Sequence, residues 1–465
     1  MVINPALKIS SVIDAWRKPV HIAPLAAFRI IFGLCMAFST LRFMALGWVH
    51  DHYIAPKFHF KYFGFEWVQA GPDWLMYGLQ ILLLAASILV IIGLYYRIAA
   101  WSQFFLFTYF QLIDITYYLN HYYYVSLACL LLAVLPAHRF FSLDVKRRPK
   151  LFSSYVPAWC IYILMLQTAI VYTYAGLAKI NTDWLLNALP LKIWLPASYD
   201  IPLLGNLFAW KYAPHVFSWA GMLYDTTIVL WLLWKPLRPW AYAAVVFFHA
   251  VTGILFQIGI FPLVMIGGTL IFFSAGWHLR WMGQLNRLFK NKELKRGQQI
   301  IYNPPVFYKK VITPALFIYF IFQVVFPWRY VLYPGNIFWT EQGYRFGWRV
   351  MLMEKASTAT FYVKDTKTGR EGEVFNSHFL NDHQEKQMAM QPDMILQYAR
   401  YLKQYYKTQG VREPEVRAEV YVTLNGCKSS LLIDPSVNLA GINDSWAHKP
   451  WILPFDQKYY TEDNK

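Results

Sequence analysis

Charged residues are scarce in this chain of 465 residues. They account for 15% of the sequence, against about 25% in a typical globular protein. Apolar residues account for 57% and aromatic residues for 19%. This balance argues against a soluble globular protein and is typical of a protein with several membrane-spanning helices.

Cysteine is scarce as well. The four cysteines, Cys35, Cys129, Cys160 and Cys427, lie far apart, so the sequence predicts neither a zinc site nor a disulfide framework. The chain also lacks a P-loop, a dinucleotide-binding glycine motif, an HExxH zinc motif and a GxSxG nucleophile motif. We therefore expect no resident metal and no nucleotide cofactor.

Nine apolar runs are long enough, or nearly long enough, to cross a bilayer, which takes about 17–25 residues. The first has no small-residue cleavage site, which indicates a retained span rather than a signal peptide. The nine runs cover residues 24–46, 73–94, 98–118, 121–136, 157–179, 215–234, 239–256, 260–275 and 310–328. Residues 181–214, which are mixed in composition, are expected to form a loop with short helices.

The net charge of +17 would suit a nucleic-acid partner, but its distribution favours another explanation. Most basic residues lie in the segments between alternate spans, as in loops on the cytoplasmic side. The opposite loops hold few basic residues, namely Lys57, Lys61, Lys192 and Lys211. We therefore expect no nucleic acid, an N-terminus inside and the segment after Arg329 outside.

The last third of the chain differs in composition. Residues 358–363 and 371–375 alternate like strands around a turn at 367–370. Residues 416–424 and 430–433 alternate again around the tight-turn pair at 425–426, and residues 394–406 have helical spacing. The expected fold is a polytopic α-helical membrane bundle over residues 1–334, followed by a small β-rich α+β extracytoplasmic domain over residues 335–465.

A few polar side chains lie within or beside the apolar runs. They are the Asn120-His121 pair between the third and fourth runs, Lys179 at the end of the fifth, Asp225 in the sixth and His249 in the seventh. A buried polar group costs about 1–3 kcal/mol unless it is paired. We therefore expect these side chains to face the bundle interior or water, where they could handle protons beside lipid.

Each of these residues also has a purely structural interpretation. Lys179 could extend its ammonium to the lipid headgroups, and His121 could cap a turn at the interface. His249 could hydrogen-bond between helices, and Asp225 could pair with a neighbouring tyrosine or lysine. The arginine Arg29 is expected to anchor helix ends or to bind headgroups.

Several motifs recur in a fixed order along the chain. They are FRIIFG at 28–33, GLYYRI at 93–98, LNHYY at 119–123, AGLAKINTDW at 175–184, FH at 248–249, FQIGIF at 256–261 and GYRFGW at 343–348. This ordered set resembles the vitamin K-dependent γ-glutamyl carboxylases, in particular their shorter bacterial relatives with a horizontally transferred transmembrane (HTTM) domain. The resemblance runs from residue 28 to residue 451.

The resemblance implies an enzyme of the bacterial inner membrane, a carbon–carbon lyase and epoxidase. Vitamin K hydroquinone would be the cosubstrate, and its reaction with O2 would give the epoxide and a strong base. That base would remove a γ-proton from a peptide glutamate, and the carbanion would add CO2. The expected partners are membrane lipid, an isoprenoid quinone and a glutamate-containing peptide on the outer face.

The resemblance also assigns roles to residues. It implies that Lys179 deprotonates the hydroquinone, and that Asn120, His121 and His249 are catalytic as well. A lysine accepts a proton only as the free amine, which desolvation in an apolar wall favours. His121 and Asn120 would donate to the developing oxyanion. The residues expected to hold the quinone are Tyr122, Tyr174, Trp184 and Gln257.

The chain departs from vertebrate members of the family in three ways. It is shorter, it has no cysteine near residues 60 and 400, where those members have a disulfide, and Ala178 stands where they have a second lysine. The sequence therefore does not identify the protein substrate. The alternatives to carboxylation are hydroquinone epoxidation alone and a non-catalytic protein that binds quinone or lipid.

Overall fold

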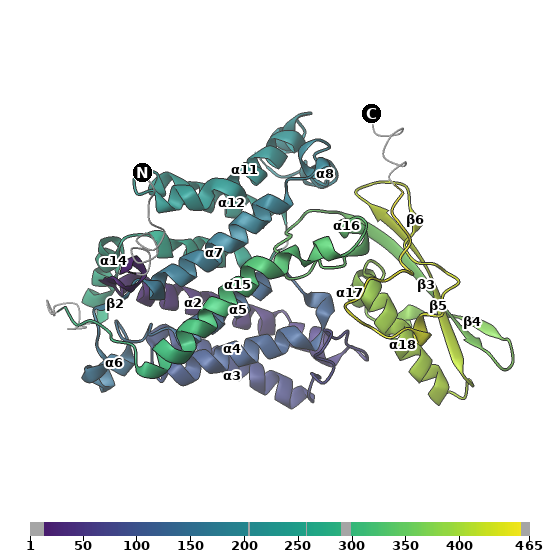
Figure 1. Ribbon diagram of the computed structural model, residues 1–465, viewed down its shortest axis with the longest axis horizontal. Helices are drawn as coiled ribbons and strands as arrows, with labels where there is room; N and C mark the ends of the chain where they lie inside the picture. Colours follow the sequence, from purple (N-terminus) through teal and green to yellow (C-terminus); the bar gives the residue numbers. More distant parts are fainter. Residues whose placement is uncertain (1–13, 203–204, 257, 290–298, 457–465) are drawn as a thin grey trace, which may run out of the picture.

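The computed structural model describes residues 14–202, 205–256, 258–289 and 299–456. Within these ranges the chain forms a bundle of long helices and a smaller domain built on a four-stranded sheet. Figure 1 shows the bundle with the sheet domain at one end, which we call the outer end. One apolar core fills the bundle, and a second joins the sheet domain to the outer ends of the helices.

The bundle helices form in the apolar runs, because a backbone in lipid must pair its N–H and C=O groups internally. Five of them have proline at the first or second position, where no intrahelical donor is lost. The helices are α2 Ala23–Ala45, α3 Asp73–Ile92, α4 Tyr96–Ile113, α5 Asn120–Val134, α7 Trp159–Ala178, α11 Ala213–Leu233, α12 Arg238–Leu255, α13 Phe261–Gly268, α14 Ala275–Phe289 and α15 Thr313–Val325. The short helices expected within residues 181–214 are confirmed as α8 Thr182–Leu185, α9 Leu191–Trp194 and α10 Gly205–Phe208.

The expected count of nine membrane spans is not confirmed, although each of the nine runs contains a helix. In the described residues, five helices are long and apolar enough to cross a membrane. The count rises to six if Phe261–Phe272 and Ala275–Leu285, bent by 117°, form one span. Helix α5 has only 15 residues, and α4 and α12 reach 18 but include arginine, glutamine or histidine.

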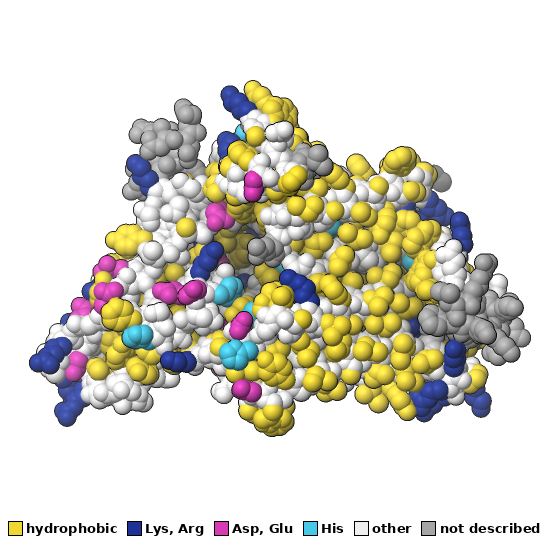
Figure 2. Space-filling view, turned by 180° about the vertical axis from the view of Figure 1, so that it is seen from behind, with side chains coloured by type: hydrophobic (Ala, Val, Ile, Leu, Met, Phe, Trp, Pro, Cys, Tyr) yellow, Lys and Arg dark blue, Asp and Glu magenta, His cyan; other side chains and the backbone are white. Residues whose placement is uncertain are grey.

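The surface of the bundle is broadly apolar. On α15, Phe317 is 69% exposed and Ile318 is 66% exposed. Figure 2 shows apolar side chains across the bundle, with Lys and Arg gathered at the end away from the sheet domain. Apolar surface of this extent needs lipid or another protein to cover it. Together with the long apolar helices, it identifies an integral membrane protein.

Arg29 ties helix ends together at the inner end of the bundle. Its buried guanidinium donates to the carbonyl oxygens of Ala137 at 3.0 Å, Phe141 at 2.6 Å and Ile91 at 3.4 Å. A Cβ at Gly93 would lie 2.6 Å from this guanidinium, and Gly93 has a φ of +65°, so the turn requires glycine. Arg29 therefore anchors helix ends, the first of its two expected roles.

The sheet domain confirms the strands and the helix expected from the sequence. Its antiparallel strands lie in the order β4-β3-β5-β6. Their bounds are β3 Lys355–Asp365, β4 Glu371–Val374, β5 Pro414–Leu424 and β6 Ser430–Leu431, and the helices beside them are α17 Asp382–Met388 and α18 Pro392–Thr408. Alternate residues of β5 are buried, and α18 packs on this strand with Ile395, Tyr398 and Leu402 buried. The turn at Asn425 and Gly426 has positive φ at both residues, as its sequence predicted.

Helices α7 and α11 approach closely at Gly176, where a Cβ would lie 2.7 Å from the backbone nitrogen of Thr226. We expect Gly176→Ala to lower the stability by about 1–3 kcal/mol, because the two helices must separate. Thermal unfolding in one detergent measures this. Gly78→Ala is the matched control, since nothing lies within 4 Å of a Cβ there, and it should be neutral or stabilising. Unchanged stability of Gly176→Ala would contradict the close approach.

Candidate functional site

Lys179 and Asp225 form a buried ion pair at the outer end of the bundle. Lys179 ends α7, and its Nζ lies 2.7 Å from Oδ2 of Asp225 in α11. Both residues are 5% exposed. The ammonium also donates to the carbonyl oxygen of Ala175 at 3.3 Å. Lys179 therefore does not reach for the headgroups, and the pairing of Asp225 with a lysine, one of its expected roles, is confirmed.

Trp184 forms one wall beside this pair. Its ring centroid lies 5.3 Å from Nζ of Lys179, within range of a cation–π contact. The side chain of Asn181 caps α8 by accepting from the backbone N–H of Trp184 at 2.9 Å. The indole N–H donates to the carbonyl oxygen of Ser218 at 2.8 Å. Trp184 therefore presents the face of its ring to the ammonium, while its N–H is engaged by Ser218.

A row of rings runs from the ion pair across the bundle interior. Tyr224, next to Asp225 in the chain, lies 6.4 Å from the imidazole of His249 between ring centroids. The ring of Phe261 in α13 lies 6.1 Å from His249 and 4.9 Å from His121. The structure thus connects Tyr224, His249 and His121 through packed rings, and Tyr224 precedes Asp225 of the ion pair in α11.

The two histidines of this row differ in their hydrogen bonds. Nδ1 of His249 lies 2.9 Å from the carbonyl oxygen of Val245. Because a carbonyl only accepts, Nδ1 carries the proton and Nε2 is the acceptor in the neutral ring. Within the described part of the chain, the imidazole of His121 makes ring contacts only, with Tyr122 and Phe261. His121 is 8% exposed.

Asn120 links the first turn of α5 to the sheet domain. Its Oδ1 accepts from the hydroxyl of Tyr118 at 2.9 Å, and its Nδ2 donates to the carbonyl oxygen of Arg349 at 2.8 Å. The Tyr118 hydroxyl in turn accepts from the backbone N–H of Phe346 at 2.6 Å. Asn120 therefore holds the turn that carries His121, and both the oxygen and the nitrogen of its side-chain amide are engaged.

The structure places one further sequence candidate, Tyr174, away from the row of rings. The hydroxyl of Tyr174 donates to the carbonyl oxygen of Val324 at the end of α15 and accepts from the indole of Trp328 just after this helix. Tyr172, two residues away and about 200° round the helix, faces Tyr224 instead, with 3.4 Å between the hydroxyl oxygens. Gln257 lies outside the described residues.

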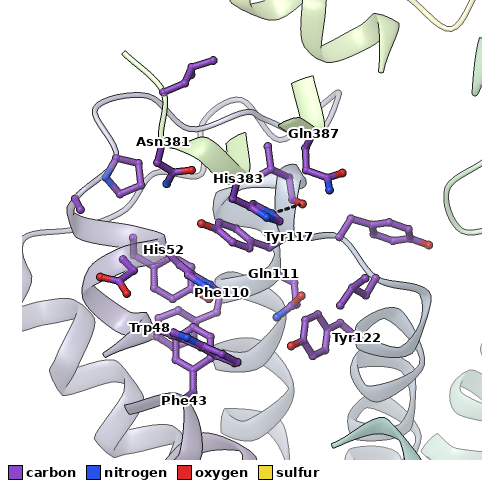
Figure 3. Close-up of a pocket in the computed structure, with 18 of the residues that line it drawn as sticks. Phe43, Trp48, His52, Phe110, Gln111, Tyr117, Tyr122, Asn381, His383 and Gln387 are labelled. Carbon is purple, nitrogen blue, oxygen red and sulfur yellow. Dashed lines mark hydrogen bonds between the residues drawn. The ribbon is translucent and has the colours of Figure 1, made fainter. Parts of the chain in front are cut away.

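A large cavity lies between the bundle and the sheet domain, and we call it the junction cavity. It has a volume of about 960 Å³ and is lined by parts of the segments 39–57, 107–122 and 377–387, together with Gln80 and Leu83. Tyr122 lines it, whereas Lys179, His121 and His249 are not among its lining residues. Figure 3 shows Phe43, Trp48 and Phe110 on its bundle side, and Asn381, His383 and Gln387 on its sheet-domain side.

Three stacked rings cross the wall of the junction cavity. Tyr117 lies between His52, at 3.8 Å, and His383, at 4.5 Å between ring centroids (Figure 3). Burial, together with the neighbouring His383, lowers the pKa of His52 to about 4. Burial also lowers the pKa of His383 and raises that of Tyr117 to about 12. The stack is therefore uncharged at neutral pH.

Sequence reasoning did not select several residues that shape these sites. It did not propose Tyr172, Tyr224 or Phe261, because aromatic residues are too frequent in this chain for one to stand out. It also did not propose His52 or His383, which come from segments far apart in the chain. The polar signal that it did use, an ionisable residue in an apolar run, found Lys179 and Asp225.

The described features define an integral membrane protein whose ionisable site lies where the helical bundle meets an extramembrane domain. Comparison with known families gives the next step: the HTTM domain family matches residues 17–277, and the vitamin K-dependent gamma-carboxylase lumenal domain matches residues 308–458. The chain belongs to the vitamin K-dependent γ-carboxylase family. No solved structure matches it.

These matches confirm the resemblance carried by the sequence motifs and indicate a vitamin K-dependent carboxylase. The lumenal-domain match also agrees with an outer position of the sheet domain, which the basic residues predicted. The position of the N-terminus on the inner side of the membrane and the domain boundary at residue 334 stay predictions.

Proposed function

We propose that the protein oxidises vitamin K hydroquinone to the epoxide with O2 and couples this reaction to the γ-carboxylation of a peptide glutamate with CO2. The observation that supports it most directly is the buried pair of Lys179 and Asp225 at the outer end of the bundle. It occurs in a chain that contains both domains of the carboxylase family.

The residues around the pair fit a hydroquinone head group. Phe261 and Tyr224 offer ring surface to a flat aromatic molecule. The imidazole of His121 is available to donate to an oxyanion, and Nε2 of His249 is available to accept from a substrate hydroxyl. When bound, the hydroquinone and O2 supply the strong base that removes the γ-proton of glutamate.

The ion pair defines how Lys179 handles the first proton. In the pair, Nζ already carries three protons, so it accepts another only after passing one to Oδ2 of Asp225, 2.7 Å away. The proton of the substrate hydroxyl then ends on Nζ, and Asp225 is left protonated. The ammonium stays beside the new oxyanion and stabilises it. The proposed base is therefore a lysine and a carboxylic acid that share a proton, rather than a lone desolvated lysine.

One assay tests the proposal. Purified protein in detergent receives reduced vitamin K, O2, labelled bicarbonate and a glutamate-containing peptide. We expect the epoxide together with a labelled peptide. Epoxide without labelled peptide would reduce the proposal to hydroquinone epoxidation alone. Bound quinone without either product would overturn it in favour of a non-catalytic quinone-binding protein.

A further inference from the structure

The junction cavity is separate from the row of rings, yet it ends next to it. Tyr122 lines the cavity and follows His121 in the chain, with 4.8 Å between their ring centroids. Helices α2, α3, α4 and α5 pack one on the next around its deep part. Its other boundary is the exposed segment near Lys57 and the sheet-domain residues near Ser377. A ligand therefore reaches the cavity from the outer aqueous side.

Two side-chain amides in the depth of the cavity lack partners. Gln80 of α3 is 4% exposed and lines the cavity. Gln111 of α4 also lines it. No other described residue hydrogen-bonds to either amide. Gln80 is buried and Gln111 is half-buried. Because an amide without a partner is costly away from water, these two groups are suited to a ligand that brings hydrogen-bonding oxygens into the cavity.

The charges of the lining lie at the mouth. Asp51, Lys57 and Asp382 are exposed there, while the deep lining has no ionised side chain. The nearby carboxylate of Asp114 is engaged by its neighbours, since Oδ1 accepts from Thr116 and Oδ2 accepts from Gln384 at 2.8 Å. An incoming carboxylate would thus meet amide donors in the depth of the cavity, and no negatively charged side chain among the deep lining residues would repel it.

We propose that the junction cavity binds the glutamate-containing segment of the protein substrate, with the glutamate side chain extended toward Gln80 and Gln111. The proposal rests on the proposed function, since it names where its second substrate binds. Gln387 at the sheet-domain side suits the carbonyl oxygens of a peptide backbone, since its Oε1 accepts from Gln391 and its Nε2 is left to donate. The uncharged rings of His52, Tyr117 and His383 offer further surface to neighbouring peptide side chains.

The deep amides also suit the chemistry. Removal of the γ-proton leaves a carbanion whose charge spreads onto the adjacent carboxylate. Donors that point to this carboxylate stabilise the charge as it develops. A quinone with an isoprenoid tail would arrive from the lipid. Because the cavity opens to the outer aqueous side, it suits the peptide rather than the quinone.

The kinetic test uses the double variant Gln80→Leu/Gln111→Leu in the full-length protein. We expect the KM for a glutamate-containing pentapeptide to rise at least about tenfold, the factor expected for lost hydrogen bonds to a charged group. The KM for hydroquinone, measured at saturating peptide, should stay at its wild-type value. A rise in the hydroquinone KM instead would assign the cavity to the quinone and overturn the proposal, as would no change in either constant.

Gln103→Leu is the matched control. This glutamine lies in α4 as well, but its amide donates to Ser87 at 2.9 Å and does not line the cavity. It should leave the peptide KM unchanged. If the double variant fails to fold, Ser377→Trp tests the same point from the exposed mouth, where a substitution is usually tolerated. It should raise the peptide KM by blocking access, and an unchanged peptide KM would contradict the site.

A second measurement needs no turnover. A benzophenone-bearing version of the same pentapeptide is photolysed with the wild-type protein, and the labelled segments are mapped by mass spectrometry. We expect labelling within residues 48–57 and 377–387, suppressed by excess unlabelled peptide and lost in the double variant. Labelling elsewhere, or labelling that the double variant retains, would overturn the site. If these segments are labelled but the protein has no carboxylase activity, the peptide-binding site is supported and the proposed function is wrong.

Discussion

Replacing Lys179 by arginine is expected to abolish epoxide formation while leaving the protein folded. Arginine retains the positive charge that Asp225 needs, but its guanidinium does not lose its proton in proteins. Loss of a general base typically slows a reaction by about 10²–10⁴-fold. The measurement is epoxide formation from reduced vitamin K and O2, with the gel-filtration profile of the variant as the check on folding.

Lys179→Ala should be equally inactive, but it also leaves the Asp225 carboxylate without its partner at 2.7 Å. Its loss of activity is therefore harder to separate from a loss of structure. The arginine variant separates the two effects. Epoxide formation at the wild-type rate by a folded Lys179→Arg variant would show that Lys179 is not the base.

Replacing Asp225 by alanine is expected to be strongly destabilising. The variant leaves the Lys179 ammonium buried and uncompensated, which costs about 3–5 kcal/mol for buried ion pairs. Removing both charges, in Asp225→Ala/Lys179→Met, should recover most of this loss, because no unpaired charge remains. Thermal unfolding of the wild type, Asp225→Ala, Lys179→Met and the double variant measures the coupling free energy between the two side chains.

Thr227→Ala is the matched control for this series. Thr227 lies two residues along α11, is half-buried, and its hydroxyl donates to the carbonyl oxygen of Leu223 within the same helix. Its substitution should change the stability by less than about 0.5 kcal/mol. Additive effects of the two single variants, with no recovery in the double variant, would contradict the buried pair.

The secondary structure could largely be predicted from the sequence, for local reasons. The apolar runs, and prolines such as Pro214 and Pro239 at their starts, lie in the chain itself. The alternation of Val416, Ala418 and Val420 likewise predicted strand β5. The number of spans could not be predicted in the same way. Length and hydropathy do not decide whether α4, with its glutamines at 103 and 111, crosses the membrane.

The candidate site was predictable only in part. A lysine and an aspartate in apolar runs each signal a polar site, yet only the packing of α7 on α11 brings Lys179 and Asp225 together. The position of Phe261 between two histidines depends on the fold of α13, and no local pattern indicates it. The stack of His52, Tyr117 and His383 depends on docking of the sheet domain, which is a contact between distant segments.

The hydrogen bonds of Asn120 have a consequence for how the two parts of the molecule communicate. Asn120 precedes His121, and it is held by Tyr118 and by the backbone of Arg349 in the segment that leads into the sheet domain. A ligand that shifts this segment also shifts the turn that carries His121. The effect of such a ligand on quinone affinity must be reciprocal, because the coupling free energy between two sites is the same in both directions. A peptide that tightens quinone binding fivefold would itself bind fivefold more tightly to the quinone-loaded protein, so that the membrane-borne and the water-borne substrate would each report the presence of the other.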